Sequence, residues 1–423
     1  MSKKSSVSLY SIMMWGIAIL FFFYEFFLRV LPATCAQDII QSLSLSVEQF
    51  SLIGSAYYIT YSFMQIPVGL LLDKFNAKIL ITLASAACTF GALWFTFAQS
   101  FAPAFISRLF IGLGSAFGFV ALMIVTLNWF PRKYFAFLVG CGQSLGAIGP
   151  LIAGAPIALL LKAVNNNWRL IFLGVALFGV SLTLLIALFF KGKPSTRDKI
   201  IFVDEQESLG KRAKTLLSRP QVWMTMIYGS TAYVSLPLLG AFWGTSYLQA
   251  KGFSNTVAAL MISMIWVGLA TASPLFGNIS DRMKRRKPML VLSSILGIMS
   301  TSLIILAPID HPYFLGVLFF FVGMGGAGQN LSFAIMTEQA PEELRATALG
   351  LNNTAIMGFA ALLPLFVTSI IQSFAVDGIL SEKAFEMGLI VLPVTFLLSL
   401  IIALFALKET FCRRQNTIHK IEA

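Results

Sequence analysis

Three charged side chains stand inside otherwise apolar segments of the chain, where an isolated charge is costly unless it is paired or hydrated. They are Glu25, Arg29 and Arg108. Glu25 and Arg29 are four residues apart, so on a helix they share a face and can pair directly. We interpret one or both arginines as anchors that hold an anionic group through bidentate hydrogen bonds. Glu25 is then the group that takes up and releases a coupling proton when an anion occupies the arginine.

The positions of the three charges leave one structural alternative open. All three fall in the same half of the membrane thickness when the helical rise is counted from the ends of their segments. A permanent bridge between Glu25 and Arg29 could fix the helix without ever touching a substrate. Arg108 has no counterpart in the second half of the chain, where Phe319 aligns with it, so a role in the repeat architecture does not explain it.

Polar and aromatic side chains that could complete a binding site follow helical spacing. Tyr57, Tyr61 and Gln65 lie at i, i+4 and i+8, which places them on one helix face. The alternative is that such residues sit at the membrane interface or join helices without contacting a substrate. The other candidates for substrate binding are Tyr24, Gln143, Tyr228, Tyr233, Trp243, Trp266, Gln329 and Asn330.

The composition predicts that these residues lie in helices that cross a membrane. The 423 residues are 57% apolar and 11% charged, with a mean hydropathy of +0.83, whereas a soluble domain has about 25% charged residues. Continuous apolar runs of about 20 residues predict transmembrane helices rather than barrel strands. We therefore predict an all-α integral membrane protein with twelve spans. The runs are 11–31, 47–72, 78–98, 102–127, 134–161, 168–190, 220–249, 255–279, 288–307, 312–336, 346–372 and 386–408.

One long hydrophilic stretch divides the twelve runs into two sets of six. Residues 191–219 have mixed charge and are expected to include an amphipathic helix at the membrane surface. This predicts an N-terminal six-helix bundle at 1–190, a C-terminal six-helix bundle at 220–410 and a cytoplasmic tail at 411–423.

The charge distribution predicts the orientation. The net charge is +12, but the basic residues sit between the apolar runs and form no stripe typical of a nucleic-acid-binding protein. Loops rich in lysine and arginine remain cytoplasmic, which predicts that both termini are cytoplasmic. Short loops favour a bacterial inner membrane. Of the 30 lysines and arginines, the opposite loops hold Lys162, Arg169, Lys251 and Lys383.

Two loops repeat one pattern, G-x-x-x-D-(K/R), at an offset of 208 residues. A second pair of loops repeats Pro131 at Pro341, so the two halves are copies of one six-helix unit. We expect the repeated aspartates to cap a helix or to bridge to a basic residue across the two halves, and thereby to act as a gate. The repeated residues are Gly69, Asp73 and Lys74 in the first loop and Gly277, Asp281 and Arg282 in the second.

With this duplicated loop in a six-plus-six pattern, the chain resembles the major facilitator superfamily over nearly its whole length. The resemblance implies a substrate cavity between the halves, lined by the first, fourth, seventh and tenth helices, and transport by alternating access. The segment from Arg108 to Gly114 resembles the family's R-x-x-x-G-x-G element, which is linked with proton coupling. The segment from Gly146 to Gly154 is similar to an antiporter element, but Leu145 and Ala153 replace two of its glycines.

These observations favour a proton-coupled importer of a small anionic or zwitterionic organic solute, such as a carboxylate, an amino acid or a short peptide. The alternative within transport is a proton-driven exporter of amphipathic compounds. A third possibility, from another class, is a receptor or scaffold that transports nothing.

Several classes of function lack their sequence signals. The chain has no phosphate-binding loop, no metal-ligand cluster and no nucleophile paired with histidine, so we predict neither an enzyme nor a bound cofactor. The four cysteines are widely spaced and are expected to be packing residues. The predicted partners are a small-molecule substrate, protons and the lipid bilayer, with no nucleic acid, and the chain is expected to be monomeric.

Overall fold

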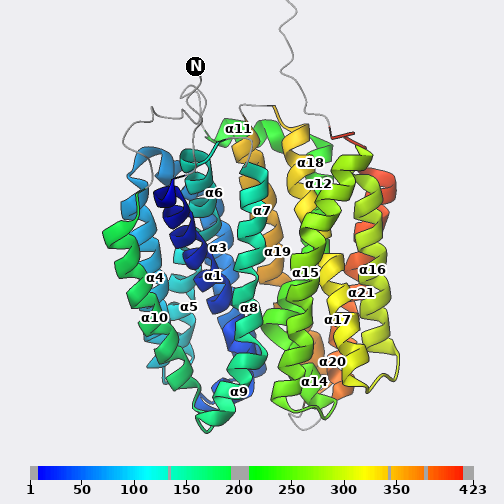
Figure 1. Cartoon of the computed structure of the whole chain (residues 1–423). Helices are drawn as coiled ribbons and strands as arrows, with labels where there is room; N and C mark the ends of the chain where they lie inside the picture. The colour runs from blue at the N-terminus through cyan, green and yellow to red at the C-terminus, as the bar shows by residue number, and fades with distance from the viewer. Residues whose placement is uncertain (1–7, 132–134, 192–208, 342–343, 376–379, 413–423) are drawn as a thin grey trace, which may run out of the picture.

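A computed structural model describes residues 8–131, 135–191, 209–341, 344–375 and 380–412. These residues form helices and connecting turns, and no strand occurs among them. The long helices run side by side between two ends of the molecule (Figure 1). We call the end that carries the lysine- and arginine-rich loops the basic end, and the other the opposite end.

The N-terminal group of helices contains the first six predicted spans. Several spans consist of two or three consecutive helices because the chain bends within them. Ser8 caps the start of α1, because its side chain accepts a hydrogen bond from the Ser11 backbone N–H. The group comprises α1 (Leu9–Thr34), α2 (Ala36–Ser42), α3 (Val47–Lys74), α4 (Ala77–Thr96), α5 (Phe101–Ser115), α6 (Gly118–Trp129), α7 (Phe135–Gly146), α8 (Ile148–Ala153), α9 (Ala155–Ala163) and α10 (Trp168–Phe189).

The C-terminal group repeats this architecture. The fourth span of the first group bends between α5 and α6, and its counterpart bends at the equivalent place near Ala327. A π-helical turn interrupts the first span of this group. The group comprises α12 (Pro220–Tyr233), α13 (Ser235–Pro237), η2 (Leu238–Trp243), α14 (Gly244–Ala250), α15 (Asn255–Met283), α16 (Lys287–Leu306), α17 (Pro312–Gly326), α18 (Gly328–Gln339), α19 (Arg345–Ser373), α20 (Glu382–Leu389), α21 (Val391–Ile401) and η4 (Ile402–Ala406).

The lengths of the helices fit a bilayer. Within the described residues, ten helical segments are long and apolar enough to cross a membrane. The 28-residue helix α3 and the interrupted run from α12 to α14 complete the twelve predicted spans. Large apolar side chains such as Leu188 and Phe405 remain exposed on the outside of the bundle, where acyl chains would surround them.

Part of the predicted connector is helical. α11 (Leu209–Leu217) lies at the basic end (Figure 1) and packs against α12 and α19. Its Leu216 side chain is buried in a small cluster with Val222 and Ala348, so the apolar side of α11 packs on protein. Residues 192–208 of the connector lie outside the described residues.

The two groups meet along α3 and α19 and through α15, which packs on α8 and α9. Near the opposite end, the Trp243 indole N–H donates to Thr368 Oγ1 at 3.0 Å, and Thr368 donates to Ser51 Oγ at 2.9 Å. Closer to the basic end, the Asn353 amide donates to Gln65 Oε1 at 2.6 Å. Polar side chains therefore connect the groups at several depths.

Close packing of helices within each group depends on glycine, as one position in each group illustrates. A methyl group at Gly112 of α5 would overlap the Tyr57 backbone of α3, and one at Gly323 of α17 would overlap the Ile265 backbone of α15. Only glycine lets the backbones approach so closely. The first of these contacts sets the position of Tyr57 next to α1.

Candidate functional site

The two charges of α1 form a buried ion pair. Arg29 Nη2 donates to Glu25 Oε2 at 3.0 Å, one helical turn away. Both side chains are inaccessible to solvent, with exposed fractions of 0% for Glu25 and 1% for Arg29. The predicted pairing at i, i+4 is therefore present, and it lies inside the protein rather than on its surface.

Tyr57 of α3 closes this pair into a ring of hydrogen bonds. Its hydroxyl donates to Glu25 Oε2 at 2.8 Å and accepts from Arg29 Nε at 3.1 Å. One carboxylate oxygen thus receives both the guanidinium and the phenol. The other oxygen, Glu25 Oε1, is buried and has no hydrogen-bond partner among the described residues.

The third nitrogen of Arg29 reaches the C-terminal group. Arg29 Nη1 donates to the hydroxyl of Tyr233, near the end of α12, at 3.1 Å. Each guanidinium nitrogen therefore donates to a different residue, and one of the three belongs to the other group of helices. We call Glu25, Arg29, Tyr57, Tyr61 and Tyr233 the Arg29 cluster.

Aromatic rings surround the Arg29 guanidinium. Its central carbon lies 4.2 Å from the centroid of the Phe26 ring and 4.8 Å from that of Tyr61. Tyr57 and Tyr58 follow at 5.4 and 5.9 Å. A weakly hydrated planar cation gains from such faces when water is excluded. The rings hold the charge in place while leaving its N–H groups to oxygen acceptors.

Arg108 contacts the backbone of α1 rather than the carboxylate. Its Nη1 donates to the Leu28 carbonyl oxygen at 2.8 Å, and its Nη2 donates to the Arg29 carbonyl oxygen at 3.4 Å. In a regular helix the Leu28 carbonyl would accept from the residue four positions later, which is Pro32 and has no N–H. Arg108 therefore supplies the hydrogen bond that Pro32 cannot make.

The charges of this region do not balance. Arg29 and Arg108 bring two guanidinium groups, and among the described residues Glu25 is the only buried carboxylate beside them. The other buried carboxylate, Glu338, lies at the basic end, paired with Arg286. One positive charge thus lacks a counter-charge in an environment that penalises it. A bound anion would neutralise it.

Some predicted site residues lie elsewhere in the fold. Tyr24 occupies another face of α1 and packs against Phe178 of α10, with ring centroids 5.7 Å apart. Tyr228 bonds within its own group, donating to the Leu290 carbonyl oxygen at 3.0 Å. Trp243 belongs to the contact near the opposite end described above. Gln143 is partly exposed on α7 and makes no side-chain hydrogen bond to the described residues.

Two predicted residues of α18 form a separate polar pair. Gln329 Nε2 donates to Asn330 Oδ1 at 2.7 Å, and Asn330 Nδ2 donates to Ser273 Oγ of α15 at 2.6 Å. Trp266 of α15 lies nearer to the Arg29 cluster. Its ring centroid is 6.2 Å from that of Phe26, the ring that packs against the Arg29 guanidinium. The buried Trp266 N–H and Gln329 Oε1 have no partner among the described residues.

Sequence reasoning missed two participants. Phe26 directly follows Glu25, but nothing in the pattern distinguished it from the other phenylalanines of the first span. Pro32 was visible as a break in the helical hydrogen-bond ladder, and its spacing of four from Leu28 could have marked that carbonyl as free. Neither signal names Arg108 as the donor, because the contact joins two helices.

The second repeated loop forms its contacts within the C-terminal group. Asp281 Oδ1 accepts from Arg286 Nη1 at 2.6 Å, whereas we expected a helix cap or a bridge across the two halves. Arg286 also donates to Glu338 Oε1 of α18 at 2.6 Å. Burial lowers the pKa of Arg286, but the hydrogen bonds to Glu338 and Asp281 outweigh burial and raise the pKa above its usual value.

The remaining predicted gate residues contribute little to this contact. Arg282 is exposed, and a methyl group at Gly277 would meet open space. In the first loop, the surroundings of Gly69 and the side chains of Asp73 and Lys74 lie outside what the structure describes. The prediction for that loop therefore stays a prediction.

Comparisons with known proteins support the fold of a multi-pass membrane protein described above. The family model of the Major Facilitator Superfamily matches residues 13–364. The chain belongs to this superfamily and has its twelve-span all-α fold.

Curated relatives share about a quarter of their aligned residues with this chain. A probable sulfoacetate transporter of Cupriavidus necator is 27% identical, over 65% of this chain and 66% of that protein. A hexuronate transporter of Bacillus subtilis is 24% identical over 56% and 57%, and a chloroplastic ascorbate transporter of Arabidopsis thaliana is 24% identical over 58% and 47%. The chain thus spans less than two thirds of the length of these relatives.

Solved structures match over nearly the whole chain. A bacterial homologue of the human lysosomal transporter Spinster has a TM-score of 0.74 at 17% identity, covering 94% of this chain and 97% of that one. The nucleoside transporter NupG has a TM-score of 0.71 at 14% identity, covering 95% and 100%. These likenesses concern the fold.

Proposed function

We propose that this protein imports a small organic anion together with a proton, and that Arg29 binds the anion. The observation that carries the proposal is the Arg29 cluster: a buried guanidinium with three exchangeable oxygen partners, beside a second, unmatched guanidinium. Carboxylates and sulfonates match the planar N–H fork of arginine. An anion can therefore replace the internal partners of Arg29 without leaving its donors unsatisfied.

Displacement of Glu25 from Arg29 by the anion would couple binding of the anion to protonation of Glu25. Burial disfavours the ionised form of Glu25, and the hydrogen bonds that it accepts from Arg29 and Tyr57 oppose this effect. An anion that takes over Arg29 Nη2 removes that partner and adds a like charge nearby, and both effects favour the neutral acid. Glu25 would then bind a proton, and release of the anion would return Glu25 to Arg29 and release the proton.

The contact with Tyr233 would link binding to movement of the two helix groups. Arg29 and Tyr233 belong to different groups, which we propose are the two bodies that rock against each other around the site. An anion that accepts from Arg29 Nη1 competes with Tyr233. Binding would thereby weaken one hydrogen bond between the groups and form new ones to the substrate.

The charges also favour a class of substrate. With Glu25 neutral, Arg29 and Arg108 present two positive charges, which suit a small anion with one or two acidic groups. Sulfoacetate, hexuronate and ascorbate, the compounds named for three relatives, are all organic anions. We propose that this chain carries an anion of this kind, and that the basic end faces the cytoplasm of a bacterial cell.

Uptake into liposomes tests the proposal. The purified chain is reconstituted, and accumulation of labelled sulfoacetate and of a labelled hexuronate is measured with the outside more acidic than the inside. We expect accumulation that collapses with a protonophore. Arg29→Lys should reduce uptake roughly 10- to 100-fold, because charge-assisted hydrogen bonds contribute about 1.5–3 kcal/mol.

Lys383→Gln is the matched control. Lys383 has an exposed fraction of 73% and pairs with Glu386 on the surface at 3.2 Å, so its loss should leave uptake unchanged. Equal uptake by the wild type and by Arg29→Lys would contradict the role of Arg29. Transport of hydrophobic cations in place of anions would overturn the proposed substrate class.

A further inference from the structure

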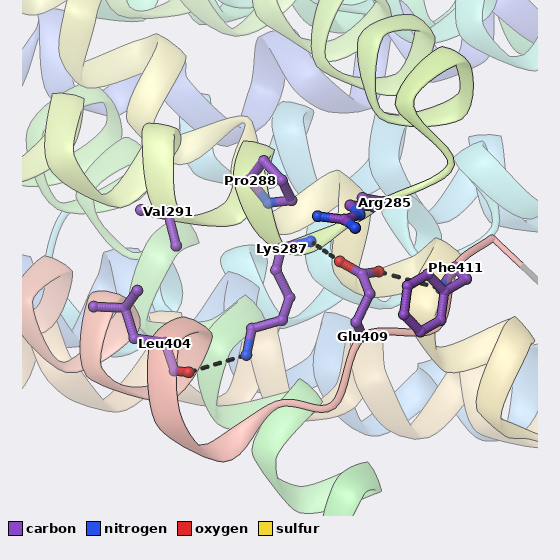
Figure 2. Close-up of a pocket in the computed structure, with 7 residues that line it drawn as sticks. All are labelled: Arg285, Lys287, Pro288, Val291, Leu404, Glu409 and Phe411. Carbon is purple, nitrogen blue, oxygen red and sulfur yellow. Dashed lines mark hydrogen bonds between the residues drawn. The ribbon is translucent and has the colours of Figure 1, made fainter.

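A groove at the basic end is unrelated to the Arg29 cluster. It has a volume of about 470 Å³ and lies between the start of α16 and the chain that follows η4. Figure 2 shows Val291 and Leu404 on one side of Lys287, with Arg285, Glu409 and Phe411 on the other. The lining therefore has an apolar part and a charged part.

The negative charge in the groove is already satisfied. Glu409 Oε1 accepts from the backbone N–H groups of Arg286, Thr410 and Phe411 at 2.8, 3.0 and 3.2 Å, and its Oε2 accepts from that of Lys287 at 3.0 Å. The carboxylate thus fastens the C-terminal segment to the loop between α15 and α16. It makes no ion pair with a basic side chain of the described residues.

The two basic side chains of the groove have donors to spare. Arg285 is exposed and makes no ion pair with the described residues. Lys287 Nζ donates one hydrogen bond, to the Leu404 carbonyl oxygen at 2.9 Å, which leaves further ammonium protons. Arg286, which stands between them in sequence, differs because its guanidinium is held by Asp281 and Glu338.

The apolar part of the groove continues onto the outer surface of the bundle. Leu404 has an exposed fraction of 43%, and its neighbour Phe405 one of 82%. On α16, the apolar side chains of Ile295 and Met299 are exposed one and two turns beyond Val291. In a membrane protein such side chains face acyl chains. A ligand with a negative head and an apolar tail can therefore contact both parts at once.

We propose that this groove binds an anionic phospholipid of the leaflet at the basic end. The phosphate accepts from Arg285 and Lys287, and an acyl chain lies along Val291 and Leu404. Electrostatic attraction of a basic side chain to an anionic lipid surface contributes about 1 kcal/mol per cation. The bound lipid would hold the segment around Glu409 against the loop that precedes α16. This site is independent of which solute the protein carries.

Thermal unfolding of the full chain in detergent tests the site. A ligand that binds only the folded protein raises the unfolding temperature. The probes are dioleoylphosphatidylglycerol, which is anionic, dioleoylphosphatidylcholine, which is zwitterionic, and glycerol phosphate, which lacks the acyl chains. We expect phosphatidylglycerol to stabilise the wild type more than either of the others. Arg285→Gln with Lys287→Gln should weaken its binding about thirtyfold, as two lost cations imply.

Two further variants separate the groove from general surface charge. Arg282→Gln with Lys284→Gln removes two exposed cations of the same loop that do not line the groove, and it should retain the response to phosphatidylglycerol. Val291→Trp fills the apolar part and should reduce the response with all charges in place. The latter variant also keeps the test decisive if the Arg285 and Lys287 variant does not fold.

Three results would overturn the proposal. Equal stabilisation by phosphatidylglycerol and phosphatidylcholine would remove the role of the negative charge. Equal losses in the two double variants would indicate diffuse attraction rather than a site. A response to glycerol phosphate as large as that to phosphatidylglycerol would identify a soluble phosphate site instead of a lipid site.

Discussion

Arg108 donates a hydrogen bond to the Leu28 carbonyl oxygen at 2.8 Å, and this carbonyl is the one that Pro32 deprives of its helical donor. The contact joins α5 to α1 one residue before Arg29. It gives Arg108 a role in positioning α1, the helix that carries Arg29, in addition to the positive charge that it brings. The two contributions can be separated by experiment.

A double-mutant cycle between Arg108 and Pro32 measures the positioning role. Arg108→Gln should destabilise the protein by about 1–3 kcal/mol, because a buried carbonyl loses its donor. Pro32→Ala restores an N–H at that position, so Arg108→Gln should cost less in its presence. Unfolding in detergent gives the coupling between the two changes. Strictly additive costs would show that Arg108 does not act through the carbonyl freed by Pro32.

Glu25→Gln should separate substrate exchange from proton coupling. Glutamine keeps an oxygen that can accept from Arg29 and Tyr57 but cannot change its protonation at physiological pH. We therefore expect exchange of labelled for unlabelled anion across liposomes to persist, while accumulation driven by a pH gradient is lost. The comparison with the wild type is made at several external pH values. Gradient-driven accumulation by Glu25→Gln at the wild-type level would assign the proton to another group.

The contacts of Arg286 at the basic end predict that neutralising its two carboxylate partners will lower the stability of the protein by unequal amounts. Glu338 is buried, with an exposed fraction of 6%, whereas Asp281 is 65% exposed. Glu338→Gln leaves the buried guanidinium without its main counter-charge and should destabilise the protein by about 3–5 kcal/mol. Asp281→Asn removes an exposed pair and should cost about 0–1 kcal/mol. Similar unfolding temperatures for both variants would show that burial of this pair is unimportant.

The sequence was sufficient to predict the fold because its signals are local and repeated. Twelve apolar runs, their loops and the offset of 208 residues between Asp73 and Asp281 predict the spans and their duplication. The pairing of Glu25 with Arg29 was also predictable, since both residues lie on one helix. These features depend on spacing along the chain alone.

The remaining contacts of the site depend on how helices are rotated against each other. Tyr24 and Tyr57 have the same residue type and lie in neighbouring spans, yet one faces α10 and the other meets Arg29. Likewise, Asp281 had several basic neighbours in sequence, and the choice of Arg286 follows from the position of Glu338 on α18. Spacing within a segment carries no information on such contacts between segments.

The hydrogen bond between Arg29 and Tyr233 should influence the balance between conformations, because it joins the two helix groups. Tyr233→Phe removes one hydrogen bond of about 1 kcal/mol, which corresponds to about a fivefold change in an equilibrium constant. Ser263 of α15 packs against Gly154, where the groups meet toward the opposite end, so separation of the groups there would expose it. In a cysteine-free background carrying Ser263→Cys, we expect maleimide to react about five times faster after Tyr233→Phe.

Tyr228→Phe is the matched control for this measurement. Tyr228 is also a buried tyrosine of α12, but its hydroxyl donates to the Leu290 carbonyl oxygen within the C-terminal group. Its loss should lower stability without changing the labelling rate at position 263. Faster labelling in both variants would indicate general loosening, and an unchanged rate after Tyr233→Phe would mean that the contact with Arg29 does not hold the groups together. Faster labelling in Tyr233→Phe alone would show that the hydrogen bond between Arg29 and Tyr233 controls separation of the two helix groups.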